Sequence, residues 1–153
     1  MDPLTREQAF QLLDGAPVAH IGLISDGAPY VTPMSFVLDG ERILFRTKPG
    51  KKLDALRHDP RVCIEASQYD PGSGEWASVI VFGNATEADD SPTGSLTVEL
   101  LYEKYSGVLG DPLSRGGFQP MAGLPHVFSV SIDEITGLSS GRGFTPRTRP
   151  GRL

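Results

Sequence analysis

The side chains best suited to bind a ligand are gathered in one short segment, FRTKPGKKLDAL. Its candidate binding residues are a hydroxyl group and three cations: Arg46, Thr47, Lys51 and Lys52. Gly50 lets the backbone approach a ligand closely, and both lysines fall where the apolar spacing predicts a helix to begin. A helix N-terminus presents unpaired N–H groups and a partial positive charge, so cations placed there form a corner for an anion. The segment therefore predicts a site for a terminal phosphate group.

The distribution of charge also indicates an anionic ligand. The net charge is −5, from 14 Lys and Arg against 19 Asp and Glu, which argues against general nucleic-acid binding. Residues 42–61 nevertheless hold seven basic side chains against two acidic ones. A local positive field in an acidic protein favours a small anionic partner, and a solvated basic surface is the alternative interpretation.

Length and composition indicate one ordinary globular domain, with 153 residues of which 39% are hydrophobic and 22% charged. The single cysteine, Cys63, excludes an internal disulfide and favours a reducing compartment. No apolar run is long enough to span a bilayer, and the N-terminal segment is too acidic and polar for a signal peptide. We therefore expect a cytoplasmic protein that contacts no membrane, with one domain over residues 1–140 and an arginine-rich tail over residues 141–153.

The tail has four arginines and no acidic residue, whereas residues 1–140 carry 10 basic and 19 acidic side chains, a net charge of −9. Opposite charges of this kind favour docking of the tail on an acidic surface of its own subunit or of a partner.

Short β-prone runs surround the basic segment. Asp-Gly pairs at residues 26–27 and 39–40 predict β-hairpins between the first three runs. Pro33 lies within the second run and predicts an edge, bulged or interrupted strand. The predicted strands are residues 18–25, 30–38, 42–47, 62–69, 76–88 and, as the final strand, 126–132.

Three helices and one long connection complete the pattern. Thr5 and Gln8 have the spacing of a capping box and predict a helix that ends at Gly15. A two-turn helix is predicted between Pro49 and Pro60, and an amphipathic helix over residues 96–105. The Gly- and Pro-rich stretch 107–125 predicts an irregular connection. These elements favour a mainly β fold, an antiparallel six-stranded split β-barrel with helices at its ends.

Other chemistries receive little support from the sequence. His20, His58 and His126 are far apart and show no metal-ligand spacing, so no metal site is expected, and His20 is interpreted as a hydrogen-bonded strand residue. Cys63 lies in an apolar strand, where a thiol is usually an inert small hydrophobic group. No Walker, Rossmann or nucleophile-elbow motif is present.

The order of these motifs resembles that of a known family, from about residue 12 to residue 138. The shared features are DG-x-P, a second DG hairpin, a strand ending in Thr, G-K-K-L, D-P-R-V and a G-x-A strand. Together they resemble the pyridoxamine 5′-phosphate oxidase-like split-barrel flavoproteins, and within them the small bacterial nitroimidazole-reductase-like branch. The resemblance implies FMN bound at the interface of a homodimer.

Site residues follow from the resemblance position by position. Backbone groups of residues 31–36 would line the flavin ring, and the basic segment would contact the ribityl phosphate. Ser78 occupies the place of a polar side chain that reaches the flavin from the partner subunit. Trp76 and Met34 are candidates to shape the pocket over the ring, with core packing as the alternative for Met34, and Phe118 and Met121 are candidates for a lid. The predicted cofactor-binding residues are Thr32, Pro33, Met34, Ser35, Arg46, Thr47, Lys51, Lys52, Trp76 and Ser78.

Departures from the family pattern bear on the substrate. The oxidases carry an arginine where this chain has Val31, and a C-terminal Trp and Arg pair that this chain lacks, so oxidation of vitamin B6 is not expected. Arg46 stands at the position of the histidine of nitroimidazole reductases. The leading hypothesis is an FMN-dependent oxidoreductase that passes hydride from a reduced nicotinamide to a small electrophile, such as a nitroaromatic or a quinone. A non-catalytic flavin carrier or redox sensor and a deazaflavin-dependent reductase are the alternatives, and haem binding ranks last.

Overall fold

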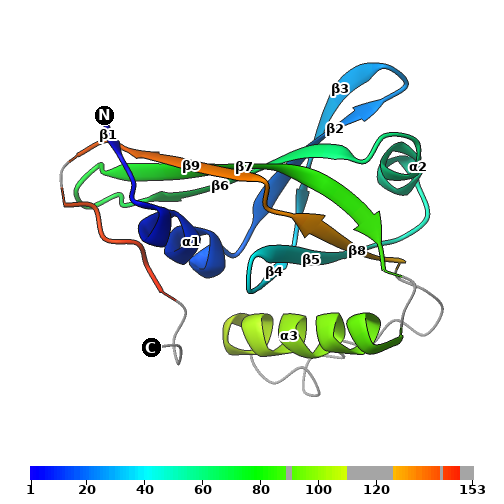
Figure 1. Cartoon of the computed structure of the whole chain (residues 1–153). Helices are drawn as coiled ribbons and strands as arrows, with labels where there is room; N and C mark the ends of the chain where they lie inside the picture. Colours follow the sequence, from blue (N-terminus) through cyan, green and yellow to red (C-terminus); the bar gives the residue numbers. More distant parts are fainter. Residues whose placement is uncertain (89–90, 110–125, 142, 149–153) are drawn as a thin grey trace.

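The computed structural model describes residues 1–88, 91–109, 126–141 and 143–148. These residues form an antiparallel, mainly β structure with three helices (Figure 1). The helices are α1 (Arg6–Gly15), α2 (Lys51–His58) and α3 (Ser91–Leu109). The strands are β1 (Asp2–Pro3), β2 (Ala19–Ser25), β3 (Ala28–Met34), β4 (Val37–Asp39), β5 (Arg42–Thr47), β6 (Arg61–Tyr69), β7 (Trp76–Glu87), β8 (His126–Ser131) and β9 (Glu134–Ser139).

The strands are ordered β3-β2-β6-β7-β8-β5-β4, and β9 pairs with both β7 and β1. The long strand β7 holds the two halves together, because its residues 77–82 pair with β9 and its residues 85–87 pair with β8. This arrangement confirms the predicted mainly β, antiparallel split barrel.

The observed strands differ from the six predicted strands in three details. The second run divides into β3 and β4 around residues 35–36, β1 is an additional short strand, and β8 is followed by β9. The chain turns between β8 and β9 where Asp133 N–H donates to the carbonyl of Phe82 at 3.0 Å, so both strands use the same edge of β7. The effect expected of Pro33 is confirmed, since β3 ends at Met34 and lies at one end of the strand order.

Local signals in the sequence explain several boundaries. Asp26 and Gly27 both have positive φ angles, 51° and 75°, and form the two-residue turn between β2 and β3. The capping box of α1 is confirmed, because Gln8 N–H donates to Thr5 Oγ1 at 3.1 Å and Thr5 N–H donates to Gln8 Oε1 at 2.9 Å. Helix α3 begins five residues before the predicted start and ends within the stretch that was expected to be irregular.

Two hydrophobic clusters form the core. The larger fills the barrel and includes the fully buried Phe36, Phe45 and Phe128, and α1 adds Leu12 and Leu13 to it. The smaller lies between α3 and the sheet, where Leu101 packs with Val37 and Leu44. Figure 1 shows α3 below β4 and β5, and α2 at the end of the sheet near the β2–β3 hairpin. None of the helices in the described part of the chain has the length and apolar character that a membrane span requires.

Residues 143–148 lie against α1 and β6. Arg147 N–H donates to Gln68 Oε1 at 2.9 Å, and Gln68 Nε2 donates to the Arg147 carbonyl at 3.2 Å. Phe144 packs against the main core, and its carbonyl accepts a hydrogen bond from Gln8. The contacts given for this segment involve backbone and apolar groups, and three of the four tail arginines lie outside the described residues, so docking through the arginines stays a prediction.

We expect Gly83→Ala to destabilise the protein, because a Cβ at this position of β7 would overlap the carbonyl oxygen of Ser131. Backbone atoms cannot move aside as a side chain can, so the loss should be about 1–3 kcal/mol of unfolding free energy. Gly94→Ala in α3 is the matched control, because the added methyl group meets no atom within 4 Å and alanine favours a helix by up to about 1 kcal/mol. Urea denaturation checks both; equal stabilities would contradict the close approach at Gly83.

Candidate functional site

The N-terminus of α2 is open to a ligand. Gly50, its N-cap residue, has φ 155° and ψ −166°, a conformation that glycine adopts readily, and among the described residues no side chain caps the helix. A Cβ placed on Gly50 would meet nothing within 4 Å. The described residues thus give the first N–H groups of α2 no side-chain cap, in contrast to α1, where Thr5 and Gln8 form a capping box.

Lys52 and Thr47 lie together beside this helix end. Thr47 is the last residue of β5, and its hydroxyl donates to the Lys48 carbonyl at 3.2 Å. The Lys52 Nζ atom lies 5.9 Å from the centre of the Phe45 ring, two residues before Thr47 on the same face of β5. Partial burial lowers the pKa of Lys52, because removal from water disfavours the charged form. An anion bound here would offset that cost.

Lys51 points toward a different element. Its Nζ atom lies 4.5 Å from the centre of the Tyr30 ring in β3, a cation–π distance. The interaction joins α2 to the β2–β3 hairpin. The two lysines that the sequence places side by side thus have different surroundings in the folded chain.

Arg46 points to the opposite face of β5 from Thr47, because consecutive strand residues alternate. Leu44, on the same face as Arg46, packs with Leu101 of α3, so Arg46 lies on the α3 side of the sheet. Burial lowers the pKa of Arg46. The structure therefore brings Thr47 and Lys52 together beside the α2 N-terminus. It places Arg46 on the opposite face of β5, so the role of Arg46 as a phosphate ligand stays a prediction.

The segment predicted to line a cofactor ring belongs to the edge strand β3 and the residues that follow it. Pro33 and Ser35 are exposed and Thr32 is half-buried, whereas Met34 is 6% exposed and packs in the main core. Strand β3 pairs only with β2 in the described sheet, so its other edge has no strand beside it. The arrangement favours the core interpretation for Met34, and the contacts of Thr32, Pro33 and Ser35 with a cofactor stay a prediction.

Tyr105 of α3 fixes the end of this segment. Its Oη atom accepts a hydrogen bond from Phe36 N–H at 3.1 Å and donates to the Pro17 carbonyl at 2.9 Å. Helix α3 is thereby tied to the β3–β4 connection, which carries the exposed Ser35.

Trp76 and Ser78 lie at the other end of the molecule from α2. Both are near the start of β7, where Trp76 pairs with Tyr69 and Ser78 with Ser67. The nine residue-to-residue steps from Ser78 to Glu87 span about 30 Å along an extended strand. Figure 1 shows this end of β7 on the left and α2 on the right. Within one subunit the structure does not bring these two residues to Lys52.

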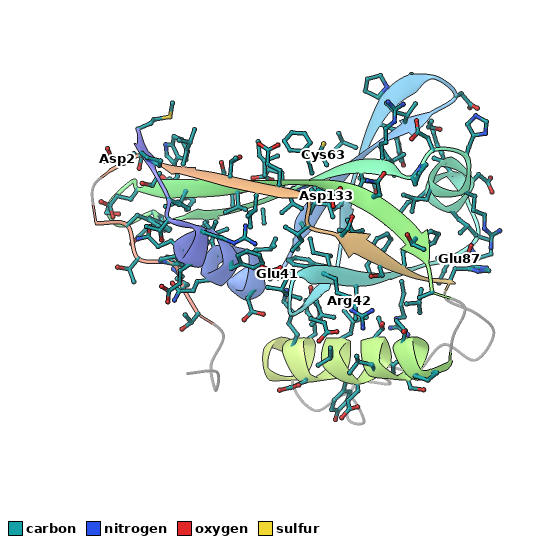
Figure 2. All side chains as sticks on the ribbon, in the orientation of Figure 1. Asp2, Glu41, Arg42, Cys63, Glu87 and Asp133 are labelled. Carbon is teal, nitrogen blue, oxygen red and sulfur yellow. The ribbon has the colours of Figure 1, made fainter. Side chains whose placement is uncertain are left out.

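A polar cluster that the sequence did not predict lies where β7 ends and β8 begins. Arg57 of α2 donates two hydrogen bonds to Glu87, at 2.8 and 3.0 Å, and His126 Nδ1 lies 2.8 Å from Glu87 Oε1. The pKa of Glu87 lies below its usual value, chiefly because of the hydrogen bonds from Arg57. Figure 2 shows Glu87 at the α2 end of the sheet. Since 30 and 39 residues separate Glu87 from its partners, only the sheet register could reveal the cluster.

The outer face of the sheet, away from α3, is apolar and exposed. Val31, Ile80, Phe82 and Leu138 remain 40–64% exposed there. Gly22, Val31, Cys63 and Phe82 share one row across the strands and line a hollow of about 360 Å³. Cys63, expected to be an inert part of an apolar strand, is exposed on this face (Figure 2), because the alternation of β6 turns it outward.

The remaining predictions from the sequence concern His20, a metal site and a lid. His20 Nδ1 lies 3.3 Å from Glu65 Oε2, as expected of a hydrogen-bonded strand residue. Among the described residues no three His, Cys, Asp or Glu side chains are grouped to hold a metal ion. The lid candidates Phe118 and Met121 lie outside the described residues.

Comparison with solved structures defines the class of fold. A FAD-binding protein from Mesorhizobium loti matches with a TM-score of 0.73 and 22% identity, over 92% of this chain and 98% of that one. A protein from Bacteroides thetaiotaomicron, proposed to act in 5-nitroimidazole antibiotic resistance, matches with a TM-score of 0.72 and 18% identity, over 90% and 86%. A FAD-binding protein from Mycobacterium smegmatis matches with a TM-score of 0.65 and 22% identity, over 91% and 97%. These likenesses establish the split-barrel fold.

Family membership follows from the sequence match. Residues 5–139 match the model of the pyridoxamine 5′-phosphate oxidase family, and the chain belongs to that family. An uncharacterised protein of Rhizobium meliloti (strain 1021) is 26% identical over 148 residues, which cover 92% of this chain and 95% of that protein. The predicted family is therefore confirmed.

We expect Glu87→Gln to weaken the fold at neutral pH and to have little effect in acid. The folded-state pKa of Glu87 is lowered from 4.5, so its ionised form contributes stability above about pH 4.5, which is lost as the pH falls through the lowered value. Urea denaturation between pH 3 and pH 7 should show the wild-type and variant stabilities converging in acid. Glu134→Gln, at an exposed position of β9, is the control; a stability difference for Glu87→Gln that persists unchanged at pH 3 would contradict the assignment.

Proposed function

We propose that the protein is an FMN-dependent oxidoreductase whose phosphate-binding corner is the Thr47, Lys52 and α2 N-terminus group. The observation that carries the proposal is that a half-buried cation, the buried hydroxyl group of Thr47 and a helix end without a described side-chain cap lie together at the end of β5. Membership of the pyridoxamine 5′-phosphate oxidase family and fold neighbours described as FAD-binding support a flavin as the ligand. A terminal phosphomonoester suits one corner with few cations, which favours FMN.

The residues present fit this cofactor. The Lys52 ammonium group and the first N–H groups of α2 would hold the phosphate, with the Thr47 hydroxyl beside them. The free edge of β3 would offer backbone groups near Thr32 and Pro33 to the polar edge of the ring. Flavin supplies hydride transfer when bound. The task of this chain's residues is to orient the ring, exclude water and leave one face open to a reduced nicotinamide and then to a small electrophile.

The site needs a second copy of the chain if Ser78 and Trp76 take part. They lie about 30 Å along β7 from the α2 end, so they can reach a flavin only from a partner subunit. The apolar outer face of the sheet gives such a pairing a surface, since exposed apolar groups there gain free energy by burial. A homodimer with two-fold symmetry is thus part of the proposal.

Two other functions have distinguishable signatures. A flavin carrier or redox sensor would bind FMN without being reduced by a nicotinamide. A deazaflavin-dependent reductase would use the same cations for a longer anionic tail. The absorbance of the purified protein separates flavin from deazaflavin, and bleaching by NADH or NADPH tests hydride entry.

Lys52→Glu should abolish the preference for a phosphorylated flavin. The substitution removes one charge-assisted contact and adds repulsion, at a cost of about 2–4 kcal/mol, or about 30- to 700-fold in the Kd for FMN. Riboflavin, which lacks the phosphate, should bind with nearly unchanged affinity. Fluorescence quenching measures both ligands, and Lys48→Glu, at an exposed position of the same segment, is the control. Equal losses for both flavins, or no loss, would remove the phosphate assignment.

Phe82→Lys should separate the subunits and weaken flavin binding together, because it places a charge on the apolar outer face where Phe82 is 47% exposed. Sedimentation should show a dimer for the wild type and a monomer for the variant. Tyr102→Lys, at a similarly exposed position of α3 on the other side of the sheet, should stay dimeric. A wild-type monomer that binds FMN tightly would rule out the shared site.

A further inference from the structure

His126 lies at the same end of the barrel as the phosphate-binding corner. It begins β8 and is the cross-strand partner of Thr47. Directly opposite residues of antiparallel strands share a face, with Cβ atoms about 4.5–5.5 Å apart. The next pair on this face is Phe45 and Phe128, whose ring centres stack 5.6 Å apart, and Lys52 Nζ lies 5.9 Å from the centre of the Phe45 ring. The register therefore places His126 beside the corner.

Among the described residues, the contacts of the imidazole ring are made through one nitrogen, Nδ1. Nδ1 lies 2.8 Å from Glu87 Oε1, and Arg57, which holds Glu87 with two hydrogen bonds, approaches the same nitrogen at 3.3 Å. Glu87 can only accept and Arg57 can only donate, and the shorter of the two contacts, 2.8 Å against 3.3 Å, assigns the Nδ1 proton to the carboxylate. The contacts described for the ring all involve Nδ1, and the side chain is 25% exposed, so no described group occupies Nε2.

The charged groups described around the ring leave a net positive charge that a bound anion would neutralise. Arg57 and Glu87 compensate each other, while Lys52 adds a positive charge on the same face of the barrel. Several titratable or charged groups are described on the elements around the ring, and of these only Arg57 and Glu87 contact it. Those groups are Lys51, Lys52, Asp54, Arg57 and His58 on α2, Arg42 and Arg46 on β5, Glu87 on β7, and Glu99, Glu103 and Lys104 on α3.

We propose that His126 is a further ligand of the flavin phosphate, which it contacts through Nε2–H when the ring is protonated. The inference rests on the proposed function, because it needs a phosphate at the Thr47 and Lys52 corner. It makes the affinity for FMN pH-dependent near neutrality, where arginine and lysine do not titrate but histidine does. Glu87 and Arg57 are positioning residues. They hold the ring through Nδ1, so that Nε2 is the atom that takes the second proton.

The test is the affinity for FMN and riboflavin at pH 6.5 and pH 8.5, measured by fluorescence quenching. For the wild type the Kd for FMN should rise severalfold between these values, because the neutral ring has no Nε2–H to donate to the phosphate. The Kd for riboflavin should stay constant. His126→Gln should bind FMN more weakly at pH 6.5 and show no pH dependence. His58→Gln, at an exposed position of α2, should behave as the wild type.

Glu87→Gln provides a second variant in case His126→Gln does not fold. Without the carboxylate the ring holds its second proton less tightly, so the FMN affinity should begin to fall at a lower pH than in the wild type. A His126→Gln protein with wild-type FMN affinity and pH profile would overturn the inference, as would equal losses for FMN and riboflavin. If Lys52→Glu lowers FMN affinity while His126→Gln does not, only the inference fails; if neither matters, the phosphate assignment fails with it.

Discussion

The change of partner along β7 is the constraint on which the rest of the structure depends. One edge of this strand pairs with β6, and the other edge takes β9 first and β8 after it. The two partners exchange near Gly83, where the backbone of Ser131 comes so close that no side chain fits. Because β8 continues to β5 and β6 continues to β2, this one crossing joins both halves of the barrel. It also fixes which side chains meet at the α2 end.

The electrostatics of that end follow from the packing. Lys52 is half-buried over the Phe45 ring, and no described side chain caps α2, so a positive charge and the helix N–H groups lie together at a cost in solvation. The Arg57, Glu87 and His126 cluster lies beside them and ties α2 to β7 and β8. Such an arrangement is stabilised by an anion, which supplies the missing charge and accepts the hydrogen bonds.

The outer face of the sheet exposes apolar side chains to solvent. Alternation along β6 and β7 sends one set of residues into the barrel and leaves the other set, including Ile80 and Phe82, on the surface. Gly22 adds a hollow to this face, bordered by the exposed Cys63. Covering such a surface with a second copy would both bury apolar area and bring Ser78 to the distant corner, so the dimer and the binding site are parts of one proposal.

The sequence by itself determined the features that depend on near neighbours. The capping box of Thr5 and Gln8, the Asp26-Gly27 turn, the interruption after Pro33 and the basic strand-to-helix segment are local, and each motif acts through bonds within a few residues. The family could be recognised because its motifs keep their order along the chain. The tertiary structure decided which of the cations meet, since β5 turns Thr47 and Arg46 to opposite faces and Lys51 turns toward Tyr30. It alone joined Glu87 to Arg57 and His126 and added β9, because strand register is set by long-range pairing that no local pattern records.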